Sequence, residues 1–293
     1  MRTISLLLIL SIFGCSAERK SECNYITDYY PQSSKAEIEF HLGNYEKAYD
    51  YYQKAFEHCD AIAIGAHHDT FRFTKVCAEL GKDNLAMDYI EKSLDKGWTI
   101  NSFQNDDTFE SILKTERGKN IIANYDKTRE GFLSSLNMDL RSEIQAMIEI
   151  DQRLVGQQEK RDSVFKVNDL RLVEIFDEFG YPNEQVVGNY EIDQINSNPS
   201  ILLLHTDDSI RINYFIPKVK DFVKKGKVPP YVLGTMYDNL ALFNNEPQTH
   251  GTYENQSGGY ANMISDTTKV NSNRAEIGLP NLKMTREINK LRR

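Results

Sequence analysis

The sequence predicts an all-α fold in which a helical-hairpin array is followed by a C-terminal helical domain with room for a small β-hairpin. Two observations lead to this prediction. Segments that begin at Gly43 and Gly81 place small residues at matching positions, and apolar residues between 127 and 159 recur every three or four positions. The chain has 293 residues, of which 40% are hydrophobic and 27% charged, so it is long enough for both parts.

The chain opens with a leader that we do not expect to be part of the fold. Met1-Arg2-Thr3 is short and basic, and the apolar run from Ile4 to Phe13 is shorter than the ~20 residues that a membrane-spanning helix needs. This combination is typical of a bacterial export signal, which is removed from the mature protein.

Residues Ile12-Phe13-Gly14-Cys15 resemble a bacterial lipobox, in which the cysteine receives a diacylglyceryl thioether and becomes the new N-terminus. The resemblance implies a signal peptide over 1–14, lipidation of Cys15 and a tether over 15–27. It also implies a cell-envelope location, on the periplasmic or surface face of the outer membrane of a Gram-negative bacterium. The alternative is an ordinary secretory cleavage after Ala17.

The charge balance restricts the partners. The formal net charge is −8, and it becomes about −9 when Arg2 leaves with the leader. A negative chain is a poor partner for nucleic acid and for anionic lipid headgroups. We therefore expect no nucleic acid partner, and a membrane contact made by the lipid anchor alone.

Three cysteines remain once Cys15 is assigned to the lipid. In an oxidising compartment one disulfide with a spare thiol is expected, and the most plausible pair is Cys59 with Cys77, because they fall on adjacent expected helices. The alternative is that Cys23, Cys59 and Cys77 are buried thiols. No cysteine or histidine spacing is typical of structural zinc, so we expect no metal and no cofactor.

The segment from Gly43 to Phe56 resembles the second half of a tetratricopeptide repeat, and a second copy runs from Leu80 to Leu94. The glycines suit the turn between two antiparallel helices, and they lie 81 − 43 = 38 positions apart instead of the usual ~34. The excess is expected in the loop 60–68. The repeat signature consists of Gly43, Ala48, Tyr52, Ala55, Gly81 and Ala86.

Two repeats rarely bury enough core alone, so we expect a helical cap over 102–121, with Asp107 or Thr108 at a helix start. The array with its cap is expected to span 28–130. The resemblance implies a concave surface for an unknown protein or peptide partner. The alternative is that the repeats act as a spacer.

The C-terminal domain is expected over 131–285. Its helices are expected to stop at glycines, and Gly258-Gly259 suits a two-residue hairpin turn. Asn271 or Ser272 can cap a short helix that ends at Gly278. The basic tail 286–293 is expected to fray.

Short motifs in this half, taken in order, resemble a bacterial helical domain family of unknown function over about 148–285. The motifs are Asp151-Gln152-Arg153, Gly180-Tyr181-Pro182, Val187-Gly188, His205 to Asp208 and Gln248 to Tyr253. This chain departs from the family pattern at Leu204, His250 and Tyr253.

Polar side chains in two of these motifs form a candidate site. The candidate residues are His205, Asp207, Asp208, Asp238, Gln248, His250 and Thr252. A histidine beside a carboxylate can act as a general base or a metal ligand, so one reading is a hydrolase acting on an envelope polymer. The other is that each histidine is structural, as we also expect for the loop residues His67 and His68.

The two functional hypotheses make different geometric predictions. An enzyme requires His205, Asp238 and the segment 248–252 to line one pocket. A protein or peptide interaction module requires an open concave face within residues 28–100. We favour the interaction module.

Overall fold

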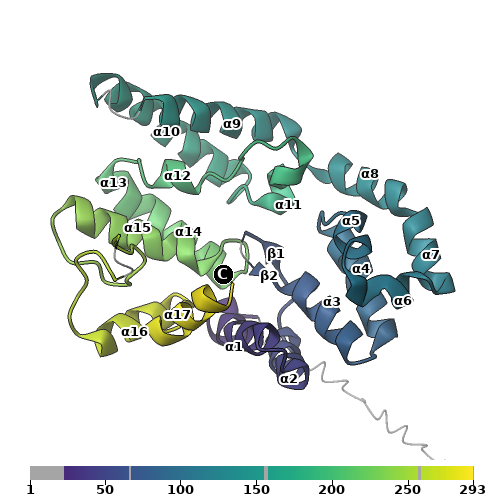
Figure 1. Ribbon diagram of the computed structural model, residues 1–293. Coiled ribbons are helices and arrows are strands. Elements are labelled where there is room, and N and C mark those ends of the chain that lie inside the picture. The colour runs from purple at the N-terminus through teal and green to yellow at the C-terminus, as the bar shows by residue number, and fades with distance from the viewer. Residues whose placement is uncertain (1–22, 66, 155–157, 257–258, 293) are drawn as a thin grey trace, which may run out of the picture.

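The computed structural model describes residues 23–65, 67–154, 158–256 and 259–292 (Figure 1). The fold is all-α, and a two-stranded sheet is the single sheet within these ranges, so the predicted fold class is confirmed. The leader and Cys15 lie outside the described residues. No described helix is long and apolar enough to cross a bilayer.

Two helical hairpins form the N-terminal part. They are α1 (Tyr30–His41) with α2 (Tyr45–Phe56), and α3 (Asp69–Glu79) with α4 (Asp83–Asp95). Gly43 and Gly81 adopt φ of +74° and +65° in the tight turns, a conformation that glycine adopts without steric cost. Ala48, Tyr52 and Ala86 are fully buried, so the small residues allow close contact between the helices.

The loop that joins the hairpins carries the sheet. Strands β1 (Ala63–Ile64) and β2 (His67–His68) pair antiparallel, with Ala63 opposite His68. Around the expected turn at Gly258-Gly259 the structure has an isolated antiparallel bridge between Glu254 and Tyr260, and Gly258 itself lies outside the described residues.

The disulfide joins Cys23 to Cys59, so the expected pairing of Cys59 with Cys77 is wrong. Cys77 is a buried free thiol on α3, where it belongs to the core of the hairpins, whereas Cys59 follows α2 and meets the start of the described chain. The π-helix η1 (Tyr25–Tyr29) comes next, and Tyr25 and Ile26 are buried. Residues 23–27, which we expected in the tether, are therefore part of the folded body.

Short helices close the array. They are α5 (Ile100–Gln104), η2 (Asp107–Phe109), α6 (Glu110–Leu113), α7 (Glu116–Ala123) and α8 (Tyr125–Ser135). The capping side chain of η2 is Asp106, whose carboxylate accepts a hydrogen bond from the Thr108 amide at 3.1 Å, so the expected cap at Asp107 or Thr108 is one or two residues late.

The C-terminal half is also helical. Its elements are α9 (Met138–Arg153), α10 (Gln158–Glu178), α11 (Glu184–Val187), η3 (Tyr190–Ile192), α12 (Ser200–Leu203), α13 (Asp208–Ile210), η4 (Arg211–Phe215), α14 (Ile216–Lys224), α15 (Pro230–Phe243), α16 (Thr267–Glu276) and α17 (Leu282–Leu291). Helix α16 begins after Asp266, whose carboxylate caps it, so the expected start at Asn271 or Ser272 is wrong.

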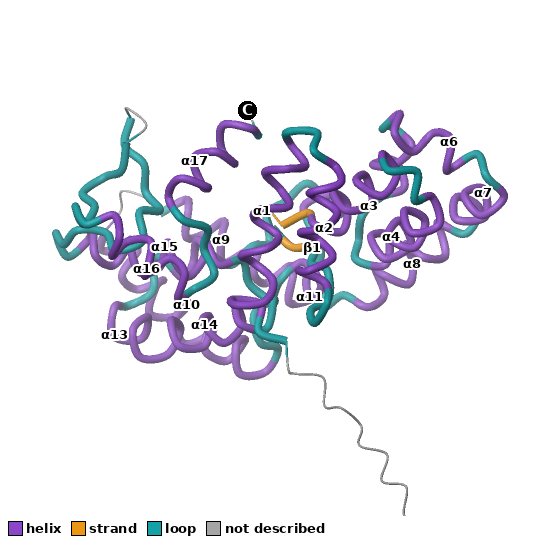
Figure 2. The backbone as a smooth tube through the Cα atoms, turned by 90° about the horizontal axis from the view of Figure 1, so that it is seen from below, coloured by secondary structure: helices purple, strands orange, loops and turns teal. Residues whose placement is uncertain are grey.

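The two halves share a core. One buried cluster combines Tyr29 and Tyr30 of the N-terminal segment with residues of α9 to α15, and the Tyr30 hydroxyl donates to the Val228 carbonyl at 3.2 Å. The second cluster lies within the hairpins and their cap. Figure 2 shows α17 beside α1 on one face of the molecule and α14 on the opposite face. The chain therefore folds as hairpins docked on a helical body.

The basic tail does not fray. Helix α17 packs on α1, and Arg292 forms an ion pair of 2.6 Å with the buried carboxylate of Glu37. Ile288 of the same helix is buried. The expectation of a frayed tail is wrong because an apolar side chain and a buried partner charge both hold the helix end in place.

Candidate functional site

The expected polar site divides into two separate groups. His205 follows α12, and its Nδ1 lies 2.9 Å from both carboxylate oxygens of Asp151, while its ring stacks on Phe165. Asp207 caps α13 by accepting from the Ser209 amide at 2.9 Å, and its own amide donates to Asp169. These side chains fix the connection between α12 and α13.

The second group surrounds Asp238 of α15, which is fully buried. Its Oδ1 accepts from the amides of Thr249 and His250 at 2.7 and 2.9 Å, and its Oδ2 accepts from the amide and hydroxyl of Thr252 at 2.9 and 2.8 Å. Gln248 accepts from the Tyr253 amide at 3.0 Å. One carboxylate thus holds the turn 248–253 in place.

The pKa of Asp238 lies below its usual value. Burial alone would raise this pKa, but the hydrogen bonds from His250 and Thr252 favour the charged form and outweigh burial. His250 stacks on Tyr237 with ring centroids 5.0 Å apart, and its Nδ1 lies 3.7 Å from Asp238 Oδ1. The charged carboxylate of Asp238 therefore binds the backbone amides of the turn 248–253.

Arg211 lies between the two groups. Its guanidinium donates to the carbonyls of Leu204 and Thr206 at 2.7 Å each and to the Asn239 amide oxygen at 2.9 Å. Within the described ranges, no hydrogen bond or ion pair joins His205 to Asp238 or His250 directly. The two histidine and carboxylate pairs therefore make no direct contact with each other in these residues. The same ranges contain no cluster of three metal-ligating side chains.

The first hairpin contacts the C-terminal helix of the chain. Glu37 of α1 pairs with Arg72 of α3 at 2.9 Å, and Arg292 covers the same carboxylate. Helix α17 therefore packs on α1 (Figure 1), and Arg292 just after it reaches the carboxylate that also binds Arg72.

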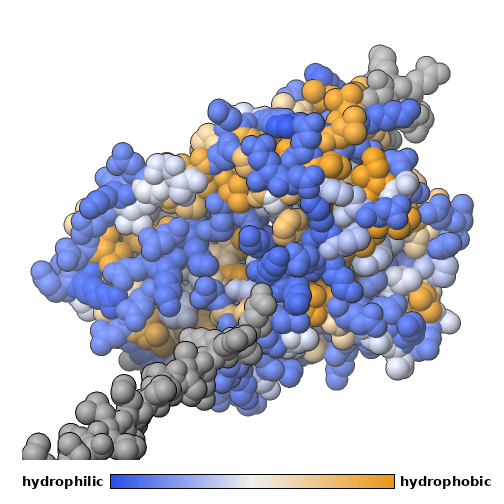
Figure 3. Space-filling view, turned by 180° about the vertical axis from the view of Figure 1, so that it is seen from behind, coloured by the Kyte–Doolittle hydropathy of each residue, from blue (hydrophilic) through white to orange (hydrophobic). Residues whose placement is uncertain are grey.

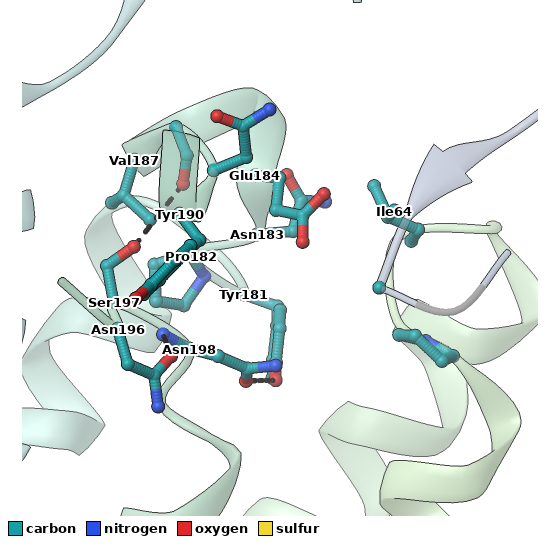
Figure 4. A pocket seen from close by; sticks show the side chains of 14 residues that line it. Ile64, Tyr181, Pro182, Asn183, Glu184, Val187, Tyr190, Asn196, Ser197 and Asn198 are labelled. Carbon is teal, nitrogen blue, oxygen red and sulfur yellow. Dashed lines mark hydrogen bonds between the residues drawn. The ribbon is translucent and has the colours of Figure 1, made fainter. Parts of the chain in front are cut away.

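A polar pocket lies instead between the β1–β2 loop and the segment 181–198. This junction pocket has a volume of about 130 Å³ and is bounded on one side by Ile64, Gly65 and Pro229. On the other side it is lined by Tyr181, Pro182, Asn183, Glu184, Val187, Gly188, Asn189, Tyr190, Asn196, Ser197 and Asn198. Figure 4 shows Asn183 and Glu184 on the side that faces Ile64.

Arg141 of α9 builds the wall of the junction pocket. Its guanidinium is fully buried and donates to the carbonyls of Val187, Gly188 and Asn189 at 2.8, 3.1 and 3.1 Å. It also pairs with Asp193 at 2.6 Å. Gly188 has φ of +77°, and a Cβ there would lie 2.1 Å from Ile192 Cδ1, so glycine is required.

The asparagines of the pocket differ in whether their side-chain polar atoms have hydrogen-bond partners. Asn183 caps α11, and Asn198 accepts from the Tyr181 hydroxyl at 3.1 Å. Asn189 donates to the Gly97 carbonyl at 3.2 Å, but its buried Oδ1 has no hydrogen-bond partner within the described part of the chain. A buried acceptor without a partner is costly and therefore rare, so Asn189 marks a place where a ligand donor would be stabilising.

Glu184 has a pKa raised to about 7. Burial raises this pKa, and a backbone hydrogen bond from Gly65 partly opposes the shift. The carboxyl can therefore donate a hydrogen bond near neutral pH when protonated and accept one when charged.

A side pocket of about 240 Å³ shares Glu184, Asn189 and Tyr190 with the junction pocket. It adds Trp98, which stacks on Phe71 with centroids 4.6 Å apart, and Lys96, whose pKa is lowered by burial. Tyr190 is 57% exposed although it is a large aromatic residue. The two pockets thus combine amide groups, one carboxyl and accessible aromatic rings.

Sequence reasoning missed this site. It used Gly180-Tyr181-Pro182 and Val187-Gly188 only as landmarks and did not single out the asparagines at 183, 189, 196 and 198. Four asparagines in one irregular segment were the available signal, because asparagine favours turns. Comparisons of the chain with family models, curated proteins and solved structures found no significant match.

Proposed function

We propose that this protein is a lipid-anchored interaction module of the bacterial cell envelope, which binds a short peptide segment of a partner protein in the junction pocket. The observation that carries the proposal is Asn189, a residue that lines both the junction pocket and the side pocket and whose buried Oδ1 has no hydrogen-bond partner within the described residues. The resemblances to a lipobox and to tetratricopeptide repeats support the location and the interaction role.

The chemistry of the pocket fits a peptide backbone. Each peptide unit carries one donor and one acceptor, and an asparagine side chain carries the same two groups. Asn189 offers a free acceptor, and Glu184 offers a carboxyl that serves as donor or acceptor near pH 7. Tyr190 and Trp98 provide apolar surface for a side chain of the ligand.

The disulfide supports export. Pairs such as Cys23 with Cys59 form and persist in oxidising compartments, which include the bacterial periplasm. Lipidation would occur at Cys15. Mass spectrometry of the mature N-terminus, on protein isolated from its native membrane, tests this lipidation. The expected mature N-terminus is an acylated Cys15, and an unmodified N-terminus at Glu18 or a retained leader would overturn the anchor.

Peptide binding is tested with a library of random peptides displayed on phage. Phage retained by the protein would be sequenced, and the selected peptides would then be titrated against it. Trp98 is the single tryptophan of the chain and lines the side pocket, so its fluorescence reports binding without a label. We expect Tyr190→Ala to weaken binding at least about tenfold, because exposed aromatic residues dominate such sites.

The matched control is Phe243→Ala on α15, which removes an aromatic side chain that is 74% exposed and lies outside both pockets. This variant is expected to bind like the wild type. A library that yields no binder, or an equal loss in Tyr190→Ala and Phe243→Ala, would overturn the proposed peptide site.

A further inference from the structure

We propose that the outer face of α14 rests on anionic phospholipid headgroups when the protein is anchored. Helix α14 is amphipathic: Ile216, Val219 and Val223 are buried, whereas Lys220 and Lys224 point to solvent, and Lys227 follows in the next turn. These three lysines are the basic stripe. They are exposed, and no carboxylate pairs with any of them within the described residues.

Two acidic groups nearby are already paired with other lysines. Asp177 is bound by Lys218 and the Tyr214 hydroxyl, and Asp221 is bound by Lys225 at 2.7 Å. Asp28 of the neighbouring η1 accepts hydrogen bonds from Asn24 and Thr27 of its own segment. The chain has a net charge of −8, but this value hides a local surface on which Lys220, Lys224 and Lys227 have no ion pair, although Asp28 and Asp60 nearby also have no cationic partner within the described residues.

The stripe lies where the tether leaves the body. Gly226 at the end of α14 is so close to Tyr25 that a Cβ would lie 2.6 Å from the tyrosine ring. The first described residues and α14 therefore share one face of the molecule (Figure 2), which is mostly hydrophilic (Figure 3). Phospholipid headgroups would meet charged groups there.

The short tether brings this face of the protein close to the membrane. From Cys15 to Cys23 there are 23 − 15 = 8 residues, which span at most ~28 Å when fully extended. This step rests on the proposed lipid anchor at Cys15. A protein held this close by the end of the chain beside α14 presents the basic stripe to the bilayer, and each lysine near an anionic surface adds to binding. The structure thus assigns a membrane-facing side, and the opposite face, with α17, is directed away.

The test uses the processed chain, residues 15–293, with Cys15→Ala so that no acyl chain contributes. Co-sedimentation is measured with vesicles of phosphatidylcholine containing about one third phosphatidylglycerol, at low salt, where attraction between charges is least screened. We expect salt-sensitive binding to these vesicles, and none to vesicles of phosphatidylcholine alone. The triple variant Lys220→Glu, Lys224→Glu, Lys227→Glu is expected to bind at least about tenfold more weakly.

The matched control is Lys269→Glu, Lys283→Glu, Lys290→Glu, which changes the net charge equally with exposed lysines of α16 and α17. It is expected to bind nearly as the starting chain does, and circular dichroism verifies that both variants fold. Equal loss in the two triple variants, or no binding of the starting chain, would overturn the inference. The lipid anchor is tested separately by the mass of the mature N-terminus, and the peptide site by Trp98 fluorescence, so each can fail alone.

Discussion

The guanidinium of Arg141 donates two hydrogen bonds to the carboxylate of Asp193, from Nε to Oδ2 at 3.0 Å and from Nη2 to Oδ1 at 2.6 Å. The arginine is on α9 and fully buried, whereas the aspartate is in the irregular segment after η3. This pair joins α9 to the wall of the junction pocket. The pKa of Asp193 is held well below its usual value, with the hydrogen bond from Arg141 as the largest cause.

We predict that Arg141→Met lowers the free energy of unfolding by about 3–5 kcal/mol, because it removes every donor that the guanidinium supplies and leaves buried carbonyls unpaired. The control is Arg171→Met. Arg171 and its partner Glu143 are both partly exposed, so the loss of this ion pair is expected to cost about 0–1 kcal/mol. Urea denaturation measures both. Similar values for the two variants would show that Arg141 is not the main support of the pocket wall.

Glu184 predicts a pH-dependent stability. Its folded pKa of about 7 is above the ordinary value of 4.5, so the folded state binds a proton more tightly than the unfolded chain, and stability is lost as the pH rises from 4.5 through 7. Glu184→Gln removes this loss of stability, because the amide does not ionise as the pH rises. We expect the variant to be more stable than the wild type by up to about 3 kcal/mol at pH 8 and little changed at pH 4.

The measurement for Glu184 is thermal and urea denaturation at both pH values. The control is Glu191→Gln, an exposed side chain in the same side pocket, which should change stability by less than about 0.5 kcal/mol at either pH. A gain for Glu184→Gln that is equal at pH 4 and pH 8 would contradict the assignment of a buried carboxyl.

The disulfide predicts a redox-dependent stability. Cys23 and Cys59 are separated by 36 positions, and closing a loop of this length stabilises by about 4 kcal/mol in the chain-entropy model. Cys23→Ser should therefore unfold at lower denaturant concentration than the oxidised wild type and should lose its sensitivity to reducing agents. Peptide mapping without reduction should recover a Cys23–Cys59 peptide, and recovery of a Cys59–Cys77 peptide would contradict this pairing.

Asp238 predicts acid sensitivity of the turn 248–253. Its folded pKa is lowered, so the stability that it contributes is present at neutral pH and is lost as the pH falls through that pKa. Asp238→Asn replaces one accepting oxygen by a donor that faces the amide and hydroxyl of Thr252, and we expect a cost of about 2–4 kcal/mol at pH 7. Asp221→Asn on the surface of α14 should cost less than about 1 kcal/mol.

The helix pattern was predictable because it is local. Gly43 and Gly81 adopt positive φ in the turns of the hairpins, and Tyr52 is buried as its spacing requires. The cap at Asp106 and the start of α16 were misplaced, since aspartate, asparagine and serine can all cap a helix and the choice depends on the backbone that precedes it. Asn271 is used elsewhere, as an acceptor for the Leu282 amide at 3.0 Å.

The candidate site was less predictable than the helices. His205 and His250 looked alike in the sequence, yet Asp151 is the partner of one and Asp238 of the other, and both histidines support turns. The junction pocket is lined by Ile64 and by Asn198, which are far apart in the sequence. No short motif records such a contact.

The sequence alone determined that the chain forms helices, where most of their turns lie and that its buried residues include many aromatics, because helical periodicity and glycine turns act within a few residues. Only the tertiary structure decided that Cys59 pairs with Cys23, that Arg292 after α17 pairs with Glu37 and that Arg141 shapes a pocket around Asn189. These features join residues far apart in the chain, and they are set by which surfaces pack together when the two halves form one core.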